Sequence, residues 1–309
     1  MAIRSPLRYP GGKHKALPLI LPLIPDDIED WREPFFGGGS VTLGYLQSNK
    51  YTAKRLIVGD LSSEIWAFWQ GVKTSADEAA DIAKQWVLEK VPLKFKLEQM
   101  YENDNDYLKV YNDAIEEAKE FWEFLTTIDC NKLSLPERAA RTFIVNRISF
   151  SGMGDSGTLS KEQFLDFKLS DINRMAEVAP LLQKVEILHA SFEETMVDVD
   201  KDKTFIFLDP PYIAQEKSGL YGKDGDTHYG FPHEELANLC RSLECKWLMT
   251  LDDSVKARRL YRWANIETFK IVYTLAGKTS EDSLAGEEIF IANYNISSDA
   301  SYDDIASLV

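Results

Sequence analysis

A short acidic and aromatic motif follows one of the most apolar segments of the chain. Asp209, Pro210, Pro211 and Tyr212 come directly after the run Thr204–Leu208. The prolines stiffen this turn and remove two backbone N–H donors, which leaves the Pro210 carbonyl able to accept a hydrogen bond. A carboxylate and a carbonyl can accept both N–H bonds of an exocyclic amino group while an aromatic ring stacks on its planar base. The motif therefore predicts chemistry at the amino group of a nucleobase, with these four residues as catalytic candidates.

Three consecutive glycines, Gly37, Gly38 and Gly39, form a second candidate site. They follow the apolar pair Phe35 and Phe36 and precede Ser-Val-Thr-Leu, a pattern typical of a strand, a tight turn and a helix. Glycine lacks a Cβ atom, so the backbone can approach a ligand closely and present N–H groups at a helix start. We expect a ligand-binding turn here, and a tight surface turn is the alternative.

Asp60 strengthens the ligand interpretation, because it ends the apolar run that begins at Arg55. It lies roughly 20 residues beyond Gly39, where nucleoside-binding sheets place the acid that holds ribose hydroxyls. The chain contains no complete Gly-x-x-x-x-Gly-Lys-Ser/Thr phosphate loop. A nucleoside cofactor that needs no phosphate site therefore fits better than a nucleoside triphosphate. The alternative for Asp60 is an ordinary acid in a turn at the end of a strand.

A loop close to the N-terminus adds a further candidate. Tyr9, Gly11, Gly12 and Lys13 combine an aromatic ring, two glycines and a cation within five positions. Alone, this loop would be a turn with a solvated lysine. Beside the other motifs, we expect it to contribute an aromatic surface and a positive charge to the same ligand site.

These motifs need a scaffold that brings several strand ends together. Short apolar runs bounded by Asp, Gly or Asn predict buried strands of a parallel α/β sheet. The stretch between Gly59 and Val185 is far longer than the ~30 residues of a βαβ unit and has helical spacing of apolar residues. We expect an α/β domain, residues 1–65 and 181–309, interrupted by a mostly helical insertion, residues 66–180. The expected strands are 55–59, 185–189, 204–208, 246–250 and 288–292, and the expected helices are 76–89, 106–125 and 136–147.

Composition restricts the class of protein. The 309 residues are 44% hydrophobic, which supports a folded core rather than a disordered chain. The three cysteines and four histidines have no metal-ligand spacing, so we expect neither a metal nor disulfides, and a reducing compartment. The apolar stretch Ala16–Ile24 is interrupted by prolines and too short to span a bilayer. We therefore expect a cytoplasmic protein, nucleoid-associated or in the host cytoplasm if viral, that is a monomer or a weak dimer.

The net charge of −15 argues against a non-specific nucleic-acid coat, because phosphate binding needs Lys and Arg. The basic residues are nevertheless grouped, which would allow local binding to phosphates on an otherwise repulsive surface. Three basic patches are expected: Arg4, Arg8, Lys13 and Lys15; Arg138, Arg141 and Arg147; Lys256, Arg258, Arg259 and Arg262.

The motifs in this order resemble the Dam-type DNA adenine-N6 methyltransferases: Pro-Gly-Gly-Lys, Glu-Pro-Phe-x-Gly-Gly-Gly, an Asp after the second strand, an insertion, and Asp-Pro-Pro-Tyr. The helix Arg138–Arg147 is similar to the family's R-A-x-x-F-x-x-N-R helix, and Ile289–Tyr294 and Gly230-Phe231 also fit. The resemblance implies a Rossmann-like, AdoMet-dependent methyltransferase sheet. It further implies a site-specific enzyme of restriction-modification type, which transfers a methyl group from S-adenosyl-L-methionine (AdoMet) to N6 of a flipped-out adenine in double-stranded DNA.

The resemblance also implies residue roles, with the helical insertion as the target-recognition domain. The implied AdoMet-binding residues are Tyr9, Gly11, Gly12, Lys13, Glu33, Phe35, Phe36, Gly37, Gly38, Gly39, Ser40, Asp60, Leu61, Ser191, Phe192 and Asp209. The implied DNA-binding residues are Arg138, Arg141, Asn146, Arg147, Phe150 and Ser151.

Several positions depart from the family pattern or leave alternatives. Ser191 stands where many members have Asp, and the stretch 149–158 lacks the base-reading arginine of GATC-specific members, which does not favour GATC specificity. We expect Asp252 and Asp253 to cap the following helix, with a position near the site as the alternative. We expect residues 221–230 to form a mobile loop that orders over DNA. An RNA base-amino methyltransferase and a catalytically idle nucleic-acid mimic or adaptor remain alternative functions.

Overall fold

The computed structural model describes residues 2–9, 11–154, 157–213, 230–273 and 284–296, so the expected loop 221–230 lies, except for its last residue, outside the described residues. One sheet contains β1 (Asp30–Glu33), β2 (Arg55–Asp60), β3 (Val185–His189), β4 (Thr204–Leu208), β5 (Lys246–Asp252), β6 (Asn265–Tyr273) and β7 (Leu284–Ala292). The strand order is β3-β2-β1-β4-β5-β7-β6. The first five strands run parallel, whereas β7 lies antiparallel between β5 and β6.

The central strands are short apolar segments that helices and loops cover on both faces. Every residue of β1 and β4 is buried, and β5 is exposed only at Lys246 and partly at Asp252. Strands that are buried on both faces need no alternation of polar and apolar residues. The α/β, Rossmann-like fold class is therefore confirmed, and each of the five expected strands corresponds to a strand of the sheet.

The strand β6 is absent from the sequence-based expectation. Glu267, Thr268 and Lys270 interrupt its apolar positions, so neither a continuous apolar run nor strict alternation marks it. Within the sheet it pairs only with β7, as an edge strand. An edge strand has one solvated side, which explains why its pattern is weak.

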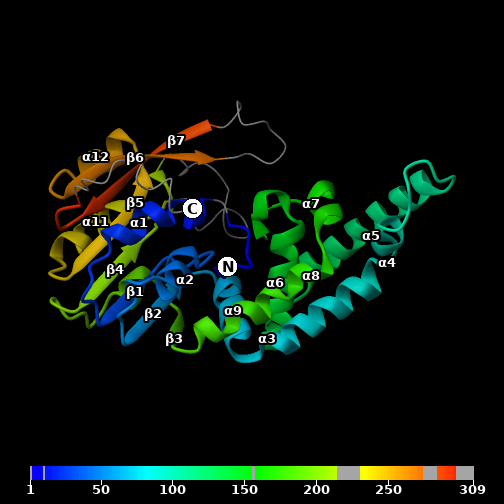
Figure 1. Cartoon of the computed structure of the whole chain (residues 1–309), viewed down its shortest axis with the longest axis horizontal. Helices are drawn as coiled ribbons and strands as arrows, with labels where there is room; N and C mark the ends of the chain where they lie inside the picture. The colour runs from blue at the N-terminus through cyan, green and yellow to red at the C-terminus, as the bar shows by residue number, and fades with distance from the viewer. Residues whose placement is uncertain (1, 10, 155–156, 214–229, 274–283, 297–309) are drawn as a thin grey trace.

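The described residues between β2 and β3 form helices and loops that extend away from the sheet, with α4 and α5 at the far end (Figure 1). The kink at Ser75 (φ −151°, ψ 43°) divides the longest of these helices, and the expected helix 76–89 is its second part. The expected helices 106–125 and 136–147 correspond to α5 and α6. The helices are α3 (Ser63–Lys90), α4 (Pro92–Leu97), α5 (Tyr107–Thr127), α6 (Leu135–Ile148), α7 (Lys161–Asp166), α8 (Leu169–Ile172) and α9 (Arg174–Leu182).

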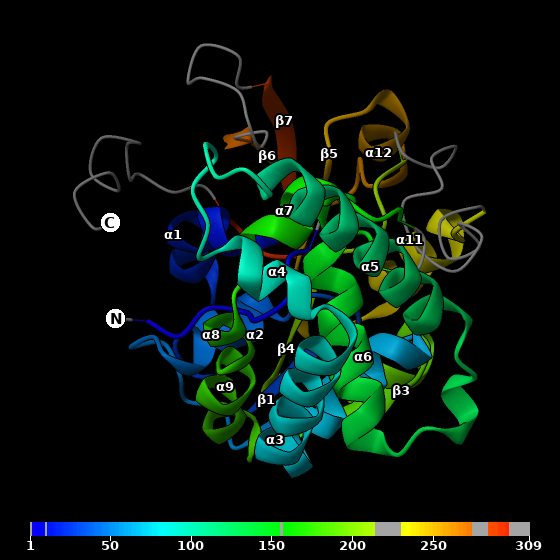
Figure 2. The same cartoon turned by 90° about the vertical axis from the view of Figure 1, so that its right-hand side faces the viewer.

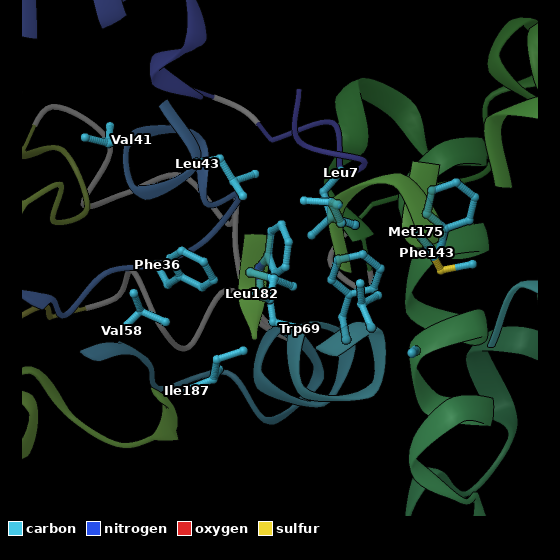
Figure 3. Close-up of a cluster of buried hydrophobic side chains, with 14 of the residues drawn as sticks. Leu7, Phe36, Val41, Leu43, Val58, Trp69, Phe143, Met175, Leu182 and Ile187 are labelled. Carbon is cyan, nitrogen blue, oxygen red and sulfur yellow. The ribbon is translucent and has the colours of Figure 1, made fainter. Parts of the chain in front are cut away.

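One continuous apolar core joins the sheet to this helical segment. Val58 and Ile187 from the sheet belong to the same buried cluster as Trp69 of α3, Phe143 of α6 and Leu182 of α9 (Figure 3). When the molecule is viewed from the helical end, α3, α5 and α6 lie in front of the strands (Figure 2). The helical segment therefore packs on the sheet through shared side chains, which fixes its orientation over the strand ends.

The remaining helices cover the sheet and its connections. Within the described ranges, none of the helices combines the length and apolar character that a bilayer crossing requires. The part of the chain that the structure describes also contains no group of three or more His, Cys, Asp or Glu arranged to hold a metal ion. These helices are α1 (Leu17–Ile20), α2 (Ser40–Leu46), α10 (Phe192–Thr195), α11 (His233–Ser242) and α12 (Val255–Leu260).

Candidate active site at the carboxyl edge of the sheet

A large cleft opens where the strand order reverses. The first strand, β1, pairs with β2 on one side and with β4 on the other, and open α/β sheets bind ligands at the carboxyl ends of such strands. The cleft has a volume of about 1390 Å³. Ordinary small-molecule pockets enclose ~300–1,000 Å³, so this cleft has room for more than one small ligand.

The structure brings the predicted catalytic and cofactor-binding residues together around this cleft. They come from the N-terminal loop, the ends of β1, β2 and β4, and the segment after β3. Three of the six predicted DNA-binding residues, Arg141, Asn146 and Ser151, also line it. The lining includes Tyr9, Gly11, Gly12, Lys13, Glu33, Phe35, Phe36, Gly37, Gly38, Gly39, Ser40, Asp60, Leu61, Ser191, Phe192, Asp209, Pro210, Pro211 and Tyr212.

Asp60 holds the glycine turn in place. Its Oδ2 accepts a hydrogen bond from the Gly37 backbone N–H at 2.8 Å, and its Oδ1 accepts one from the Ser62 N–H at 2.9 Å. Burial raises the pKa of this carboxyl group, and these backbone hydrogen bonds act in the opposite direction. A carboxylate has about four acceptor positions, so Asp60 retains capacity for ligand hydroxyls while it orders the turn.

The glycine turn also makes room for Tyr9, a function that the sequence did not reveal. Gly37 adopts φ +44°, and a Cβ atom there would lie 2.8 Å from the Tyr9 ring. A Cβ atom at Gly38 would lie 2.8 Å from the Tyr9 Cβ. The Trp69 indole N–H donates to the Gly37 carbonyl at 2.8 Å on the side of α3. The glycines therefore let the N-terminal loop and α3 close on the same turn.

Glu33 is a buried acid directly below this turn. Its Oε2 accepts the Thr42 backbone N–H at 3.0 Å and the Thr42 hydroxyl, and only 2% of its surface is exposed. The pKa of Glu33 is raised to about 8, mainly by burial and also by the nearby charge of Asp209, against the lowering effect of the Thr42 bonds. Glu33 is thus mostly protonated at neutral pH and links the end of β1 to α2.

Asp209 is oriented by two donors on the same oxygen. Its Oδ1 lies 2.8 Å from Lys13 Nζ and accepts the Thr250 hydroxyl at 2.8 Å. Lys13 is 2% exposed and also donates to the Gly11 carbonyl at 2.8 Å. The lysine predicted as a cofactor contact thus forms a buried ion pair with the acid of the catalytic motif.

The Tyr212 ring lies beside the same lysine, with Lys13 Nζ 4.9 Å from its centroid. Burial raises the pKa of the Tyr212 hydroxyl well above its ordinary value, and the charges of Asp209 and Glu288 raise it further. Glu288 on β7 is 2% exposed and interacts with this hydroxyl. Tyr212 is therefore held by its hydroxyl end and by one face, and it stays neutral.

Three aromatic rings line another part of the cleft. Phe35, Phe192 and Phe231 approach one another with centroid distances of 5.7, 5.7 and 5.8 Å. Neighbouring Ser191 caps α10, because its hydroxyl accepts the Glu194 N–H at 3.3 Å and its own N–H donates to the Glu194 carboxylate at 2.8 Å. Ser191 thus orients the aromatic wall. Phe35 and Phe192 were predicted cofactor contacts, whereas Phe231 entered only as part of the family resemblance.

The structure places Arg138 and Arg141 in internal contacts rather than on a phosphate-binding surface. Arg138 Nη2 lies 2.9 Å from the Glu64 carboxylate, and Arg141 Nη1 lies 3.7 Å from it. Arg141 also donates through Nε to the Leu125 carbonyl at 2.7 Å and is 3% exposed. Both arginines lie on the face of α6 that packs against α3, which the sequence pattern of the helix alone does not reveal.

Arg147 and Asn146, at the end of α6, are likewise engaged within the protein. Arg147 Nη2 lies 3.2 Å from Asp171 Oδ2. The Asn146 side chain accepts the Arg8 N–H at 2.8 Å and donates to the carbonyls of Arg8 and Gly152 at 2.7 and 2.9 Å. Asn146 therefore fastens the N-terminal loop to the turn after α6.

That turn presents the two remaining predicted DNA-binding residues. Phe150 is 59% exposed, and Ser151 adopts φ +52°, a left-handed conformation that is uncommon for a residue with a side chain. Ser151 lines the cleft. An exposed aromatic ring on a turn at the rim of the cleft is available to a macromolecular ligand.

Asp252 has a role other than the expected helix cap. Its Oδ1 accepts the Ile213 backbone N–H at 2.6 Å, whereas the cap of α12 is the Ser254 hydroxyl, which accepts the Ala257 N–H. Thr250 and Glu288 also contact the catalytic motif and were not predicted. A polar residue inside an otherwise apolar strand was the available signal for Thr250 and an acid before Ile-Phe-Ile-Ala for Glu288.

Comparisons with known proteins agree with this site. A family model described as D12 class N6 adenine-specific DNA methyltransferase matches residues 9–275. Type II methyltransferase M1.LlaDCHI of Lactococcus lactis subsp. cremoris is 24% identical over 311 residues, which cover 94% of this chain and 96% of that protein. Modification methylase StsI of Streptococcus sanguinis is 40% identical over 228 residues, 72% of this chain but 31% of that protein. Type II methyltransferase M.FokI of Planomicrobium okeanokoites is 36% identical over 77 residues, 25% of this chain and 11% of that protein.

Proposed function

Because this chain belongs to the D12 class N6 adenine-specific DNA methyltransferase family, we propose that it transfers a methyl group from AdoMet to N6 of an adenine flipped out of duplex DNA. The observation that carries the proposal is the position of Asp209, Pro210 and Tyr212 in the same cleft as the glycine turn and Asp60. The names of the relatives support a site-specific modification enzyme of a type II system. A DNA substrate and the expected reducing compartment fit a cytoplasmic location.

The residues around the glycine turn fit AdoMet. Asp60 can accept bonds from ribose hydroxyls, and the wall formed by Phe35 and Phe192 suits a flat heterocycle. The basic side chains among the described lining residues are Lys13 and Arg141, and both face acidic partners within the protein. That donor set favours a nucleoside cofactor without phosphates. When bound, AdoMet supplies an electrophilic sulfonium methyl group.

Asp209 and Pro210 act on the adenine amino group. The lone pair of this nitrogen is delocalised into the ring, which makes the nitrogen a weak nucleophile. One N–H bond to the Asp209 carboxylate and one to the Pro210 carbonyl favour a pyramidal nitrogen with an available lone pair. The carboxylate would also stabilise the positive charge that develops on the nitrogen as the methyl carbon bonds to it and separates from the donor sulfur, and one N6 proton would then pass to solvent. Tyr212 stacks on the base and holds it in line.

The helical segment and the turn after α6 contact the DNA. An adenine inside a duplex cannot reach Asp209, so it must rotate out at a cost of a few kcal/mol. Phe150 is the exposed aromatic side chain at the rim of the cleft, and Ser151 lies beside it on the cleft wall. These residues and the N-terminal loop, which Asn146 holds against them, form the DNA-facing rim.

The test compares Asp209→Ala with wild-type protein and with Asp77→Ala, an exposed acid on α3 that serves as the control. We expect Asp209→Ala to lower the rate of methyl transfer to duplex DNA at least ~10²–10³-fold, the usual effect of losing a transition-state contact. DNA affinity, measured by fluorescence anisotropy, should stay within a few-fold. Retention of activity in Asp209→Ala would overturn the assignment.

A further inference from the structure

Two polar side chains of β5 hold both ends of the catalytic motif. Thr250 Oγ1 donates to Asp209 Oδ1 at 2.8 Å, and Asp252 Oδ1 accepts the Ile213 backbone N–H at 2.6 Å. Residues two apart in a strand project to the same face, so both side chains leave β5 on one side. The four-residue motif is therefore fixed at its first residue and directly after its last.

The contact of Thr250 decides which oxygen of Asp209 remains for a substrate. Lys13 Nζ and the Thr250 hydroxyl both lie 2.8 Å from Oδ1. Among the residues that the structure describes, no donor contacts Oδ2 of Asp209, whose side chain is 23% exposed. Two donors on one oxygen restrict rotation of the carboxylate, and Thr250 is fully buried, so water cannot replace its hydroxyl.

We propose that Thr250 and Asp252 are positioning residues for the methyl transfer. Thr250 turns Asp209 so that Oδ2 faces the adenine amino group, and Asp252 sets the direction of the chain that carries the Pro210 carbonyl and Tyr212. This inference rests on the proposed function. It adds a second strand to the site, because the predicted catalytic residues all follow β4.

Thr250 and Asp252 would act by fixing the positions of the two acceptors, the Asp209 carboxylate and the Pro210 carbonyl. The amino group must meet two acceptors at once, and a shift of about 1 Å at a reacting group can cost ~10²-fold in rate. A buried hydroxyl could instead serve stability alone, since Thr250 also lies 3.5 Å from the Leu208 carbonyl. The two roles differ in what happens to the rate of the folded enzyme.

The test measures single-turnover methyl transfer at saturating AdoMet and duplex DNA. Thr250→Val removes the hydroxyl and keeps the shape, so we expect a ~10–100-fold lower rate with AdoMet affinity within about threefold. Thr250→Ser keeps the hydroxyl and should recover most of the rate despite the lost methyl group. Thr74→Val on the exposed surface of α3 is the control, and melting temperatures are recorded for all variants.

Asp252 is tested in the same assay by a matched pair of variants. Asp252→Asn retains an oxygen that can accept the Ile213 N–H, whereas Asp252→Ala does not. We expect Asp252→Ala to lower the rate ~10-fold or more and Asp252→Asn to restore most of it.

The outcomes separate this inference from the proposed function. A wild-type protein that transfers no methyl group would contradict the proposed function itself. An active wild type with Thr250→Val at the wild-type rate would overturn the positioning role alone. Equal loss of rate in Thr250→Val and Thr250→Ser, in step with their melting temperatures, would do so too, because it indicates a structural role.

Discussion

Among single residues, two buried acids of the cleft differ in state: the carboxylate of Asp209 is oriented by hydrogen-bond donors, and the carboxyl group of Glu33 is protonated. Asp209 is oriented by Lys13 and Thr250, which suits a carboxylate that must accept a bond from a substrate. Glu33 is enclosed by protein, and burial raises its pKa to about 8. The two acids are close enough to interact, so a neutral Glu33 avoids a second negative charge beside the catalytic one.

The shifted pKa of Glu33 predicts a pH-dependent contribution to stability. The folded state binds this proton more tightly than the unfolded state, where the pKa is about 4.5. The stabilisation that protonated Glu33 gives the folded state is therefore complete below about pH 4.5 and is lost as the pH rises towards 8. Glu33→Gln cannot ionise, so its free energy of unfolding relative to wild type should rise between pH 5 and pH 8, by at most about 1.4 kcal/mol per pH unit.

Urea denaturation of Glu33→Gln and wild type at several pH values checks this expectation. Other titrating groups cancel in the difference between the two proteins. The Glu78→Gln variant, on an exposed acid of α3, is the control and should show no comparable rise. A difference for Glu33→Gln that is constant across this pH range would contradict the neutral state.

At the scale of elements, α6 works as a connector. Its arginines Arg138 and Arg141 pair with Glu64 of α3, and its last turn carries Asn146, which bonds to Arg8 and Gly152. The helix therefore joins the helical segment, the N-terminal loop and the rim of the cleft. Its basic residues suggested a DNA-binding surface, but a charge pattern cannot show which face of a helix meets another helix.

The hydrogen bonds of Asn146 predict the effect of removing them. Asn146→Ala would leave the Arg8 and Gly152 backbone groups without their partner in a buried site, and each such group costs ~1–3 kcal/mol. We expect the free energy of unfolding to fall by about 2–4 kcal/mol. Urea denaturation measures it against Asn112→Ala, an exposed asparagine of α5. If Asn146→Ala lowers the free energy of unfolding no more than Asn112→Ala does, the hydrogen bonds of Asn146 contribute little to stability.

The elements that the sequence predicted well are those with a strong local signal. Runs such as Thr204–Leu208 are apolar throughout and end at polar residues, so both their type and their bounds could be predicted. The edge strand β6 has mixed polarity, so it could not be predicted from the sequence. The cleft residues followed from motifs at strand ends, whereas Thr250 and Asp252 contact the motif only through the pairing of β4 with β5. Such contacts depend on strand order, which local patterns do not encode.

At the scale of the whole molecule, the charge of −15 limits where DNA can bind. The structure removes several residues from the expected basic patches: Lys13 pairs with Asp209, Arg138 with Glu64, and Arg258 with Asp253. Arg4 remains exposed near the N-terminus, and we propose that it contributes to the DNA-facing rim. Few phosphate contacts on an acidic protein predict weak retention on non-specific DNA.

Salt dependence measures this distribution of charge. The logarithm of DNA affinity should fall linearly with the logarithm of salt concentration, with a slope of about −0.9 per phosphate contact. Arg4→Ala should reduce the slope by about 1, whereas Arg138→Ala should leave it unchanged because its guanidinium is internal. Anisotropy titrations at several salt concentrations check both variants. A reduced slope in a folded Arg138→Ala variant would show that Arg138 contacts a DNA phosphate and would contradict its internal role.

The central claim is methyl transfer to adenine N6 in duplex DNA, and one measurement tests it most directly. Purified protein is incubated with methyl-labelled AdoMet and, in parallel, with mixed-sequence duplex DNA or RNA, and the labelled nucleosides are identified after digestion. The account predicts label in N6-methyladenine of the DNA at defined sequences, absent with Asp209→Ala. Label confined to RNA, label on another base, or no transfer at all would contradict it.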